Sequence, residues 1–374
     1  MALVGLQVEH FRCLEKVELT RDPRYNLFVG QNASGKTSLL EAMFFLGRGR
    51  SFRSRKLDRM IRQGQPEFRI VGRVQHDGPG IVLGVRGTRG GTEIRVGGAP
   101  ADSAADLASH FPPQIIDPEI HKLLEEGPSR RRRFLDWGVF HVERAFMPTW
   151  QRYHRALRQR NAALRHGGPP ELAVVWDGEL AGAGEALSEL RGRYVELLAP
   201  GLSEIGRRLL GLEVALVYHR GWAADEQLMV SLSAGLERDR RYGMTHVGPH
   251  RADVVVRVDG HAARERVSRG QQKLLAAALT LAQLALQDQV TPGRSALLLD
   301  DPAAELDGAN LERLLGVVRE LPVQLFVTSL RPDLPGLGAP GRLFHVEHGA
   351  VRSAEGPGAR AALDSAPLPS SPNV

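Results

Sequence analysis

The chain has 374 residues, is 42% hydrophobic and carries a formal net charge of +6, with 49 lysines and arginines, which predicts a globular protein of two or three domains. The basic balance suits a surface that binds a polyanion, and an ordinary solvated surface explains it equally well. The single cysteine, Cys13, excludes a disulfide framework, and with no stretch near the ~20 apolar residues of a membrane span a cytoplasmic protein is expected. Cys13 itself is expected to be a small buried hydrophobe.

The first hundred residues alternate strand patterns with one helix pattern. Alternation in LVGLQVEHF predicts an opening strand, and the apolar run from Tyr25 to Val29 predicts a second strand that enters a glycine loop. A helix is expected from Thr37 to Leu46. Three glycine-punctuated strands, FRIVGRVQ, GIVLGVRG and TEIRVGG, then predict an antiparallel meander.

Helical patterns dominate residues 104–208. The two longest are RRRRFLDWGVFHVERAFM and ELAGAGEALSELRGRYVELL, and the breaker HGGPP separates them. Further on, the strand patterns LEVALVYHR, ADVVVRVDG, ALLLDD and VQLFVTSL alternate with helices that begin near Gly270 and around ANLERLLGVVREL. This order predicts an α/β fold with a mainly parallel sheet, interrupted by a helical insertion, and the proline-rich end predicts a disordered tail.

A phosphate-binding loop stands between the second strand and the first helix. The segment GQNASGKT matches the pattern G-x-x-x-x-G-K-[ST] in the context that the pattern requires. Its glycines let backbone N–H groups turn toward phosphates, Lys36 reaches the β- and γ-phosphates of ATP, and the Thr37 hydroxyl ligates Mg²⁺. The predicted nucleotide contacts are Gly30, Gln31, Asn32, Ala33, Ser34, Gly35, Lys36, Thr37 and Ser38.

Two carboxylates end a later apolar strand. In SALLLDDPAAELD, Asp300 and Asp301 follow four apolar residues, and the carboxyl end of a parallel strand faces the phosphate site. Asp300 is predicted to organise Mg²⁺, and Asp301 to orient or deprotonate the attacking water. Taken alone, the two acids also fit a solvated turn before Pro302.

The stretch SRGQQ opens an apolar helix, and Ser268 is suited to cap it. The order of phosphate loop, SRGQQ, acidic strand and AELD resembles the ATP-binding-cassette (ABC) ATPases, with Ser268 to Gln272 as the signature motif and Ala304 to Asp307 as the D-loop. This resemblance implies that the signature helix caps the γ-phosphate of a partner's ATP, through Ser268, Gly270 and Gln271. Two identical chains would then meet around two ATP molecules.

A closer resemblance is to the RecF family of bacterial recombination mediators, which share the architecture of SMC-type ATPases. It rests on HFRCLEKVEL, GQNASGKTSLLEAMFFLGRGRSFR, GPSRRRRFLDWGVF, RQRNAALR, THVGPHRADV, SRGQQKLLAAAL and LLLDDPAAELD, in that order. It implies an ABC-type ATPase head with a mixed sheet, an antiparallel meander and an inserted, mostly helical lobe. The implied division is 1–103 and 209–352 for the ATPase lobe, 104–208 for the insertion and 353–374 for the tail.

The resemblance also implies a function. It implies a weak DNA-stimulated ATPase that binds double-stranded and gapped DNA as an ATP-gated homodimer. It further implies cooperation with RecR and RecO in loading RecA, and no membrane partner. Two other functions stay open: the cytoplasmic ATPase subunit of an ABC transporter, and an ATP-gated scaffold that does not hydrolyse ATP.

Two positions depart from the general ABC pattern, and a third is ambiguous. Asp301 stands where transporters have Glu, and its shorter side chain predicts slow hydrolysis. Thr328 stands where transporters place a phosphate-sensing histidine, so it is either the sensor or a plain strand end. Gln114 is predicted as the magnesium-sensing glutamine of the Q-loop, with Gln63 and Gln65 as alternatives.

Two basic segments are the candidates for DNA contact, because arginine pairs well with phosphate. One is the run Arg130, Arg131, Arg132 and Arg133 at the start of a helix. The other follows the phosphate-loop helix and comprises Arg50, Arg53, Arg55, Lys56 and Arg59; it is also placed to approach the adenine or ribose of ATP. His246 and His250 flank Gly248 and Pro249, which break a helix, so no zinc site is expected.

Overall fold

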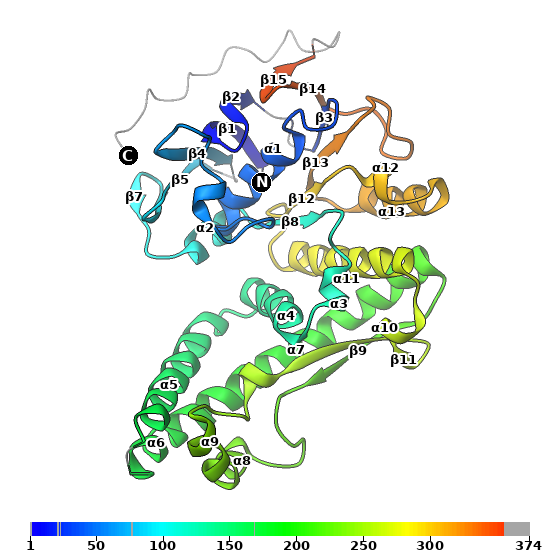
Figure 1. Cartoon of the computed structure of the whole chain (residues 1–374). Helices are drawn as coiled ribbons and strands as arrows, with labels where there is room; N and C mark the ends of the chain where they lie inside the picture. The colour runs from blue at the N-terminus through cyan, green and yellow to red at the C-terminus, as the bar shows by residue number, and fades with distance from the viewer. Residues whose placement is uncertain (1, 21, 23, 76–77, 168, 355–374) are drawn as a thin grey trace. The chain divides into compact units, whose positions relative to one another are not determined.

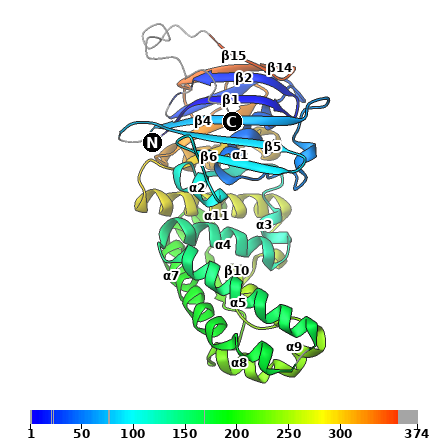
Figure 2. The ribbon, with the colours of Figure 1, turned by 90° about the vertical axis from the view of Figure 1, so that its left-hand side faces the viewer.

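The computed structural model describes residues 2–20, 22, 24–75, 78–167 and 169–354 (Figures 1 and 2). The contacts divide the chain into two compact units. Unit 1 comprises Met1–Glu119 and Thr291–Val374, and unit 2 comprises Ile120–Val290. Among the described residues, no helix combines the length and the apolar character needed to cross a bilayer.

The first sheet of unit 1 has the order β2-β1-β4-β5-β6-β7, with antiparallel neighbours throughout (Figure 2). Its strands are β1 (Ala2–Phe11), β2 (Leu14–Thr20), β4 (Glu67–Gln75), β5 (Ile81–Thr88), β6 (Gly91–Val96) and β7 (Ala99–Pro100). The predicted meander is therefore confirmed. The alternating burial along β4 is typical of a sheet with one face on the core.

The second sheet of unit 1 has the order β15-β14-β3-β13-β12-β8 and is parallel except for the pair β14 and β15. Its central strands are buried at every position, as expected for parallel strands covered on both faces. The strands are β3 (Tyr25–Val29), β8 (Pro113–Ile116), β12 (Ala296–Leu299), β13 (Gln324–Ser329), β14 (Arg342–Glu347) and β15 (Ala350–Ser353).

One hydrophobic core joins both sheets through helix α1 (Lys36–Arg48), whose residues 38–47 are all buried. The core combines side chains of β1, β4 and β5 with side chains of β3, β13 and β14. The other helices of unit 1 are η1 (Leu57–Arg59), α2 (Ala104–His110), α12 (Pro302–Glu305) and α13 (Gly308–Glu320). Because α1 is held on both sides, the phosphate loop that precedes it has a rigid support.

Unit 2 is built around the helix α7 (Asp177–Leu210), which packs against α5 (Phe146–His166) and α11 (Arg269–Val290). Its small antiparallel sheet has the order β11-β10-β9. The remaining elements are α3 (Lys122–Glu125), α4 (Pro128–Val142), α6 (Glu171–Val174), β9 (Val214–His219), α8 (Leu228–Ala234), α9 (Leu236–Tyr242), η2 (Pro249–Arg251), β10 (Asp253–Val258), β11 (His261–Ala262) and α10 (Ala263–Arg266).

Several details differ from the sequence predictions. Residues 113–116, within the stretch predicted as helical lobe, form strand β8 of the parallel sheet, and the compact unit runs over 120–290 instead of 104–208. The long pattern RRRRFLDWGVFHVERAFM is split into α4 and α5. Cys13 is exposed at the turn between β1 and β2, so the prediction that it is buried is wrong. Residues 355–374 of the predicted tail lie outside the described residues.

Candidate functional site: a phosphate loop and its acidic strand

The phosphate loop needs glycine at both of its ends. A Cβ at Gly30 would lie 2.2 Å from the carbonyl oxygen of Val346, so a side chain there would displace β14. Gly35 has φ 114°, a conformation that residues with a side chain rarely adopt. The sequence motif therefore has a steric cause in this fold, and the prediction of a strand, a glycine loop and a helix is confirmed.

The loop offers unused hydrogen-bonding capacity to an anion. Helix α1 has no side-chain cap and no acidic residue in its first turn, so its N-terminal N–H groups and positive dipole end are available. The Ser34 hydroxyl is buried and has no partner in the described part of the chain. The Lys36 ammonium donates to the carbonyl oxygens of Gly30 and Gln31, at 2.6 and 2.9 Å. These groups fit a polyphosphate.

Asp300 lies at the end of β12 and joins the loop to the acidic strand. Its Oδ1 accepts hydrogen bonds from the hydroxyls of Thr37, at 3.0 Å, and Thr328, at 2.8 Å. Burial raises the pKa of the Asp300 carboxyl, and the bonds from Thr328 and Thr37 and the charges of Arg53 and Lys36 oppose that rise. The two residues that the sequence predicts as Mg²⁺ ligands, Thr37 and Asp300, are therefore neighbours in the fold.

Asp301 follows in a strained backbone conformation. Its φ of 45° and ψ of 58° are left-handed, which is uncommon for a residue other than glycine and is found at functional sites. Its N–H donates to the Thr328 hydroxyl at 2.9 Å. Burial lowers the pKa of the Lys36 ammonium, whereas the charges of Asp301 and Asp300 raise it, which places both carboxylates in the electrostatic field of that lysine.

Glu41 on α1 gathers charged groups that the sequence analysis missed. Its side chain is fully buried, and it accepts two hydrogen bonds from the Arg12 guanidinium, at 2.6 and 3.0 Å. It also accepts from the Ser51 hydroxyl at 2.5 Å and from Arg53 Nη1 at 3.4 Å. Arg53, from the second basic segment, is thus held where its charge acts on Asp300. The signal in the sequence was an acid within the apolar run LLEAMFFL.

The signature stretch opens α11 with a reciprocal cap. The Ser268 hydroxyl accepts from the N–H of Gln271 at 3.3 Å, and Gln271 Oε1 accepts from the N–H of Ser268 at 2.9 Å. The predicted cap is therefore confirmed. Ser268 and Gly270 are exposed, so this helix start is accessible on unit 2.

Gln114 is not brought to the phosphate loop. It lies inside β8, opposite Leu297 of β12, which is three residues before Asp300. At about 3.3 Å per residue, that is roughly 10 Å along the sheet from the level of Asp300. Its side chain is buried, and its Nε2 has no partner in the described part of the chain.

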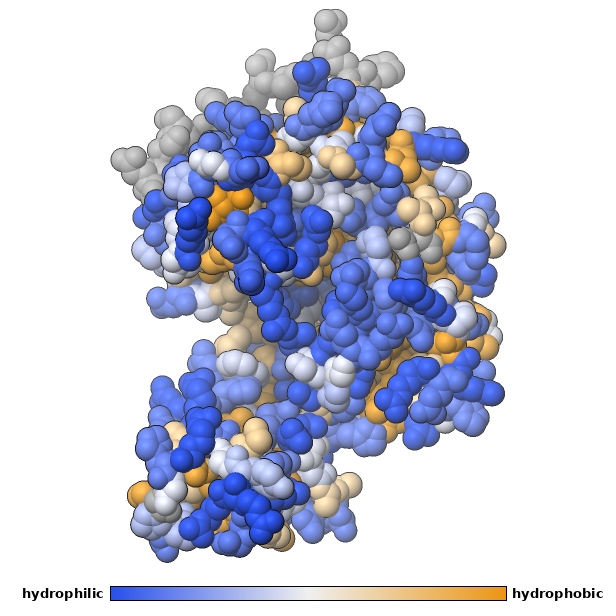
Figure 3. Space-filling view, in the orientation of Figure 1, coloured by the Kyte–Doolittle hydropathy of each residue, from blue (hydrophilic) through white to orange (hydrophobic). Residues whose placement is uncertain are grey.

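Three arginines of the run on α4 form contacts inside unit 2. Arg131 forms a bidentate ion pair with Asp253 of β10, with both bonds at 2.8 Å. Arg132 donates to the carbonyl oxygen of Ala252 at 2.7 Å, and Arg130 pairs with Glu126 at 3.0 Å. In contrast, Arg55 and Lys56 of the second basic segment are exposed on unit 1. On the face shown in Figure 3, hydrophilic side chains predominate.

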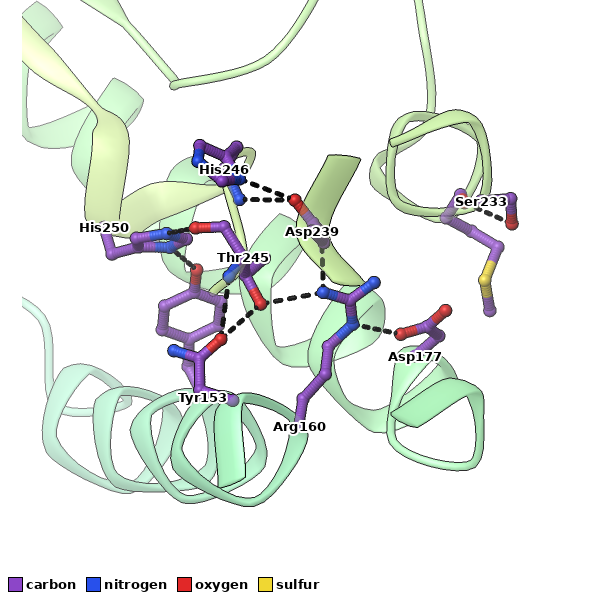
Figure 4. Close-up of polar contacts among 10 residues, drawn as sticks. Tyr153, Arg160, Asp177, Ser233, Asp239, Thr245, His246 and His250 are labelled. Atoms are coloured by element: carbon purple, nitrogen blue, oxygen red, sulfur yellow. Dashed lines mark hydrogen bonds and ion pairs between the residues drawn. The ribbon is translucent and has the colours of Figure 1, made fainter. Parts of the chain in front are cut away.

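His246 and His250 belong to a buried polar network (Figure 4). Arg160 of α5 donates to Asp177, at 2.6 Å, and to Asp239, at 2.7 Å, and His246 also contacts Asp239. His250 bridges the Tyr153 hydroxyl and the Thr245 carbonyl oxygen. No group of three metal-ligating side chains occurs among the described residues. Both histidines thus have a structural role that ties the loop before β10 to α5.

Comparisons with known proteins place the site in context. The model of the RecF/RecN/SMC N-terminal domain family matches residues 2–340. The chain is 42% identical to the DNA replication and repair protein RecF of Pseudomonas aeruginosa strain LESB58 over 359 residues, covering 94% of this chain and 97% of that protein. It is also 42% identical to the protein of the same name from Stutzerimonas stutzeri strain A1501, covering 96% and 99%.

Solved structures give the same result for the fold. The structure of the recombination mediator protein RecF with ATP, in the RecFOR pathway, matches with a TM-score of 0.86 at 28% identity, over 95% of this chain and 98% of that one. An Smc head bound to the C-terminal winged-helix domain of ScpA matches with a TM-score of 0.57 at 17% identity, over 95% and 97%. The predicted fold class, an ABC-type ATPase head of mixed α/β structure, is confirmed.

Proposed function

The chain belongs to the RecF family of DNA replication and repair proteins, and on this premise we propose that it is an ATP-dependent DNA-binding protein of recombinational repair. The observation that carries the proposal is the hydrogen bond from Thr37 to Asp300, which joins the phosphate loop to an acidic strand 263 residues later. The transporter alternative is not favoured, because the full-length relatives described above are repair proteins.

ATP is the proposed ligand of the loop, as in the RecF structure with ATP. The uncapped N-terminus of α1 and the buried Ser34 hydroxyl supply neutral donors for phosphate oxygens. Lys36 supplies the positive charge, and its position over the loop is fixed by the carbonyl groups of Gly30 and Gln31. We propose the whole segment from Gly30 to Ser38 as the triphosphate site.

Mg²⁺ is proposed to accompany ATP, held by Thr37 and Asp300. A hydroxyl and a carboxylate 3.0 Å apart are hard oxygen ligands of the kind that this ion prefers. Thr37 and Asp300 would hold this ion beside the phosphate loop, where it would supply positive charge to offset the negative charge that develops during phosphoryl transfer. Thr328 keeps the Asp300 carboxylate oriented through its second hydrogen bond.

Asp301 is the proposed acceptor of the proton from the attacking water, and Arg53 adds positive charge that acts on Asp300. The left-handed backbone conformation of Asp301 and the hydrogen bond from its N–H to Thr328 fix the backbone position from which this short carboxylate extends. Because Asp is one methylene shorter than Glu, we propose that ATP hydrolysis is slow. We further propose that DNA stimulates this hydrolysis.

Pairing of two copies is proposed to complete the site. The start of α11, with Ser268 and Gly270 exposed and Gln271 beside them, offers a helix N-terminus to a phosphate of a second copy. In a two-fold pair each chain gives its phosphate loop to one ATP and this cap to the other. Double-stranded and gapped DNA are the proposed substrates of the pair, with RecR and RecO as protein partners and RecA as the protein finally loaded.

Sedimentation of a labelled duplex with a single-stranded gap tests this function. With ATP, two chains are expected to travel with each DNA; without ATP, or with Ser268→Arg, pairing is expected to be lost. Ser268→Thr keeps the capping hydroxyl and serves as the matched control. ATP binding by the monomer is expected to survive in both variants, because Ser268 lies outside the phosphate loop. Complexes that form equally well without ATP would contradict the proposal.

A further inference from the structure

We propose that a groove of about 580 Å³ in unit 2 binds single-stranded nucleic acid. The groove is lined by Trp150, Arg155 and Arg158 of α5 and by Trp176 and Glu179 at the start of α7. It deepens the proposed function, on which it rests, because a gapped duplex presents unpaired bases beside the double strand. It also lies on different elements from both basic segments that the sequence suggested.

The charge of the groove favours a polyanion. Glu179 is held by Arg152 in a bidentate pair, with bonds of 2.9 and 3.0 Å, so the acid of the lining is already neutralised. Arg155 and Arg158 are exposed and have no ion-pair or hydrogen-bond partner within the described part of the chain. They lie about one helical turn apart on α5, which directs both guanidinium groups to the same side. Two unpaired guanidinium groups suit successive phosphates.

The rings of the groove favour bases. Trp150 and Trp176 are partly exposed, so part of each indole surface is accessible to a ligand. Trp150 also packs against the His154 ring, with centroids 4.1 Å apart. Burial, together with the charges of Arg191, His250 and Arg158, lowers the pKa of His154 to about 4, so this ring is neutral at pH 7. Neutral aromatic faces beside cations are what unpaired bases stack on.

A second groove of unit 2 supplies the contrast. It measures about 500 Å³ and is lined by Arg238, Arg240, Arg241 and Glu237 with alanine, leucine, glycine and proline residues, and no aromatic residue lines it within the described part of the chain. Arginines in either groove would bind an acidic peptide, whereas the stacking of bases requires aromatic ring faces. The combination of indoles and unpaired arginines is therefore what assigns nucleic acid, and not an acidic protein segment, to the groove on α5.

Intrinsic fluorescence gives a direct test, since two of the four tryptophans of the chain line the groove. Oligothymidine is expected to quench the tryptophan fluorescence of the full-length protein in the absence of ATP. The double variant Arg155→Glu with Arg158→Glu is expected to weaken binding at least tenfold. The slope of the logarithm of affinity against the logarithm of salt concentration is expected to fall by about 1.4. Trp150→Phe is expected to weaken binding roughly tenfold and to remove much of the quenching. Arg238→Glu with Arg241→Glu changes the charge equally and is expected to bind like wild type.

Three outcomes would overturn the assignment: no quenching of wild type, equal binding by both double variants, or a polyglutamate peptide that binds wild type as tightly as oligothymidine and is lost in the Arg155 and Arg158 variant. Binding of fully paired duplex with ATP, measured in parallel, separates this proposal from the function. If oligothymidine behaves as expected while wild type fails to bind duplex, the groove assignment stands and the proposed function falls. The variant is expected to retain ATP-dependent duplex binding.

Discussion

Thr328 links the two carboxylates of the acidic strand through one hydroxyl. It donates to Asp300 Oδ1 at 2.8 Å and accepts from the N–H of Asp301 at 2.9 Å, and its side chain is fully buried. A hydroxyl with both roles filled is suited to position these acids. The sequence analysis proposed Thr328 as a phosphate sensor or a plain strand end; the contacts support a third role, that of a positioning residue.

Thr328→Val tests this role, because valine has nearly the same shape but no hydroxyl. It removes the hydrogen bond that the Asp301 N–H donates to Thr328, and the loss of such a bond in a partly buried position costs about 1–3 kcal/mol. The expected result is a fall in ATP turnover of roughly tenfold or more, with nucleotide affinity changed by less than about twofold. Ser329→Ala is the control on the same strand, since among the described residues that hydroxyl accepts from the N–H of Arg331 alone. Unchanged turnover in Thr328→Val would refute the positioning role.

The Asp300 carboxylate is expected to lower the stability of the nucleotide-free protein. Burial raises its pKa in the fold, so the ionised form is less favourable there than in the unfolded chain. The contribution of Asp300 to the free energy of unfolding is therefore most favourable below the pKa of the unfolded chain, near 3.8, where the carboxyl is protonated. This contribution is lost as the pH rises through the higher pKa that the carboxyl has in the folded protein. Asp300→Asn is therefore expected to raise Tm at pH 7, with a gain that shrinks toward pH 4. A Tm difference that does not vary with pH would contradict this cause.

At the scale of elements, local patterns were predictable and distant pairings were not. The phosphate loop, the cap of α11 and the meander follow from short-range rules, and the structure has all three. Strand β8 was missed because PPQII is short and proline-rich, so nothing local distinguishes it from a loop. The arginine run of α4 was assigned to DNA because the partner of Arg131 lies 122 residues away in the chain.

Arg131 is consequently predicted to matter for stability. Arg131→Gln leaves the Asp253 carboxylate without its bidentate partner in a partly buried position, with side-chain exposures of 16% and 19% in the wild-type pair. The expected cost is about 2 kcal/mol, seen as a Tm several degrees lower. Arg155→Gln, on the exposed side of α5, is the matched control and is expected to leave Tm unchanged. If Arg131→Gln kept wild-type Tm and instead flattened the salt dependence of duplex binding, α4 would face DNA after all.

At the scale of the whole molecule, the order of motifs in the sequence predicted the fold class. Which segments lie side by side at the site could be seen only in the structure. Strand β3, which precedes the phosphate loop, lies between β13 and β14, both from the last part of the chain. No periodicity encodes that neighbourhood. The position of Glu41 between Arg12 and Arg53 likewise depends on three segments meeting, so the sequence showed only an acid within an apolar helix.

The bond between Thr37 and Asp300 also has a consequence for synthesis. A ribosome releases the phosphate loop early, and at ~5–20 residues per second the 263 residues up to Asp300 take on the order of 15–50 s to follow. Strands β13 and β14, which flank β3, come later still. A prematurely terminated chain therefore carries the loop without its acidic strand or its flanking strands. The proposed ATP site, and with it the proposed pairing of two copies, is therefore expected only in chains whose translation has passed β14.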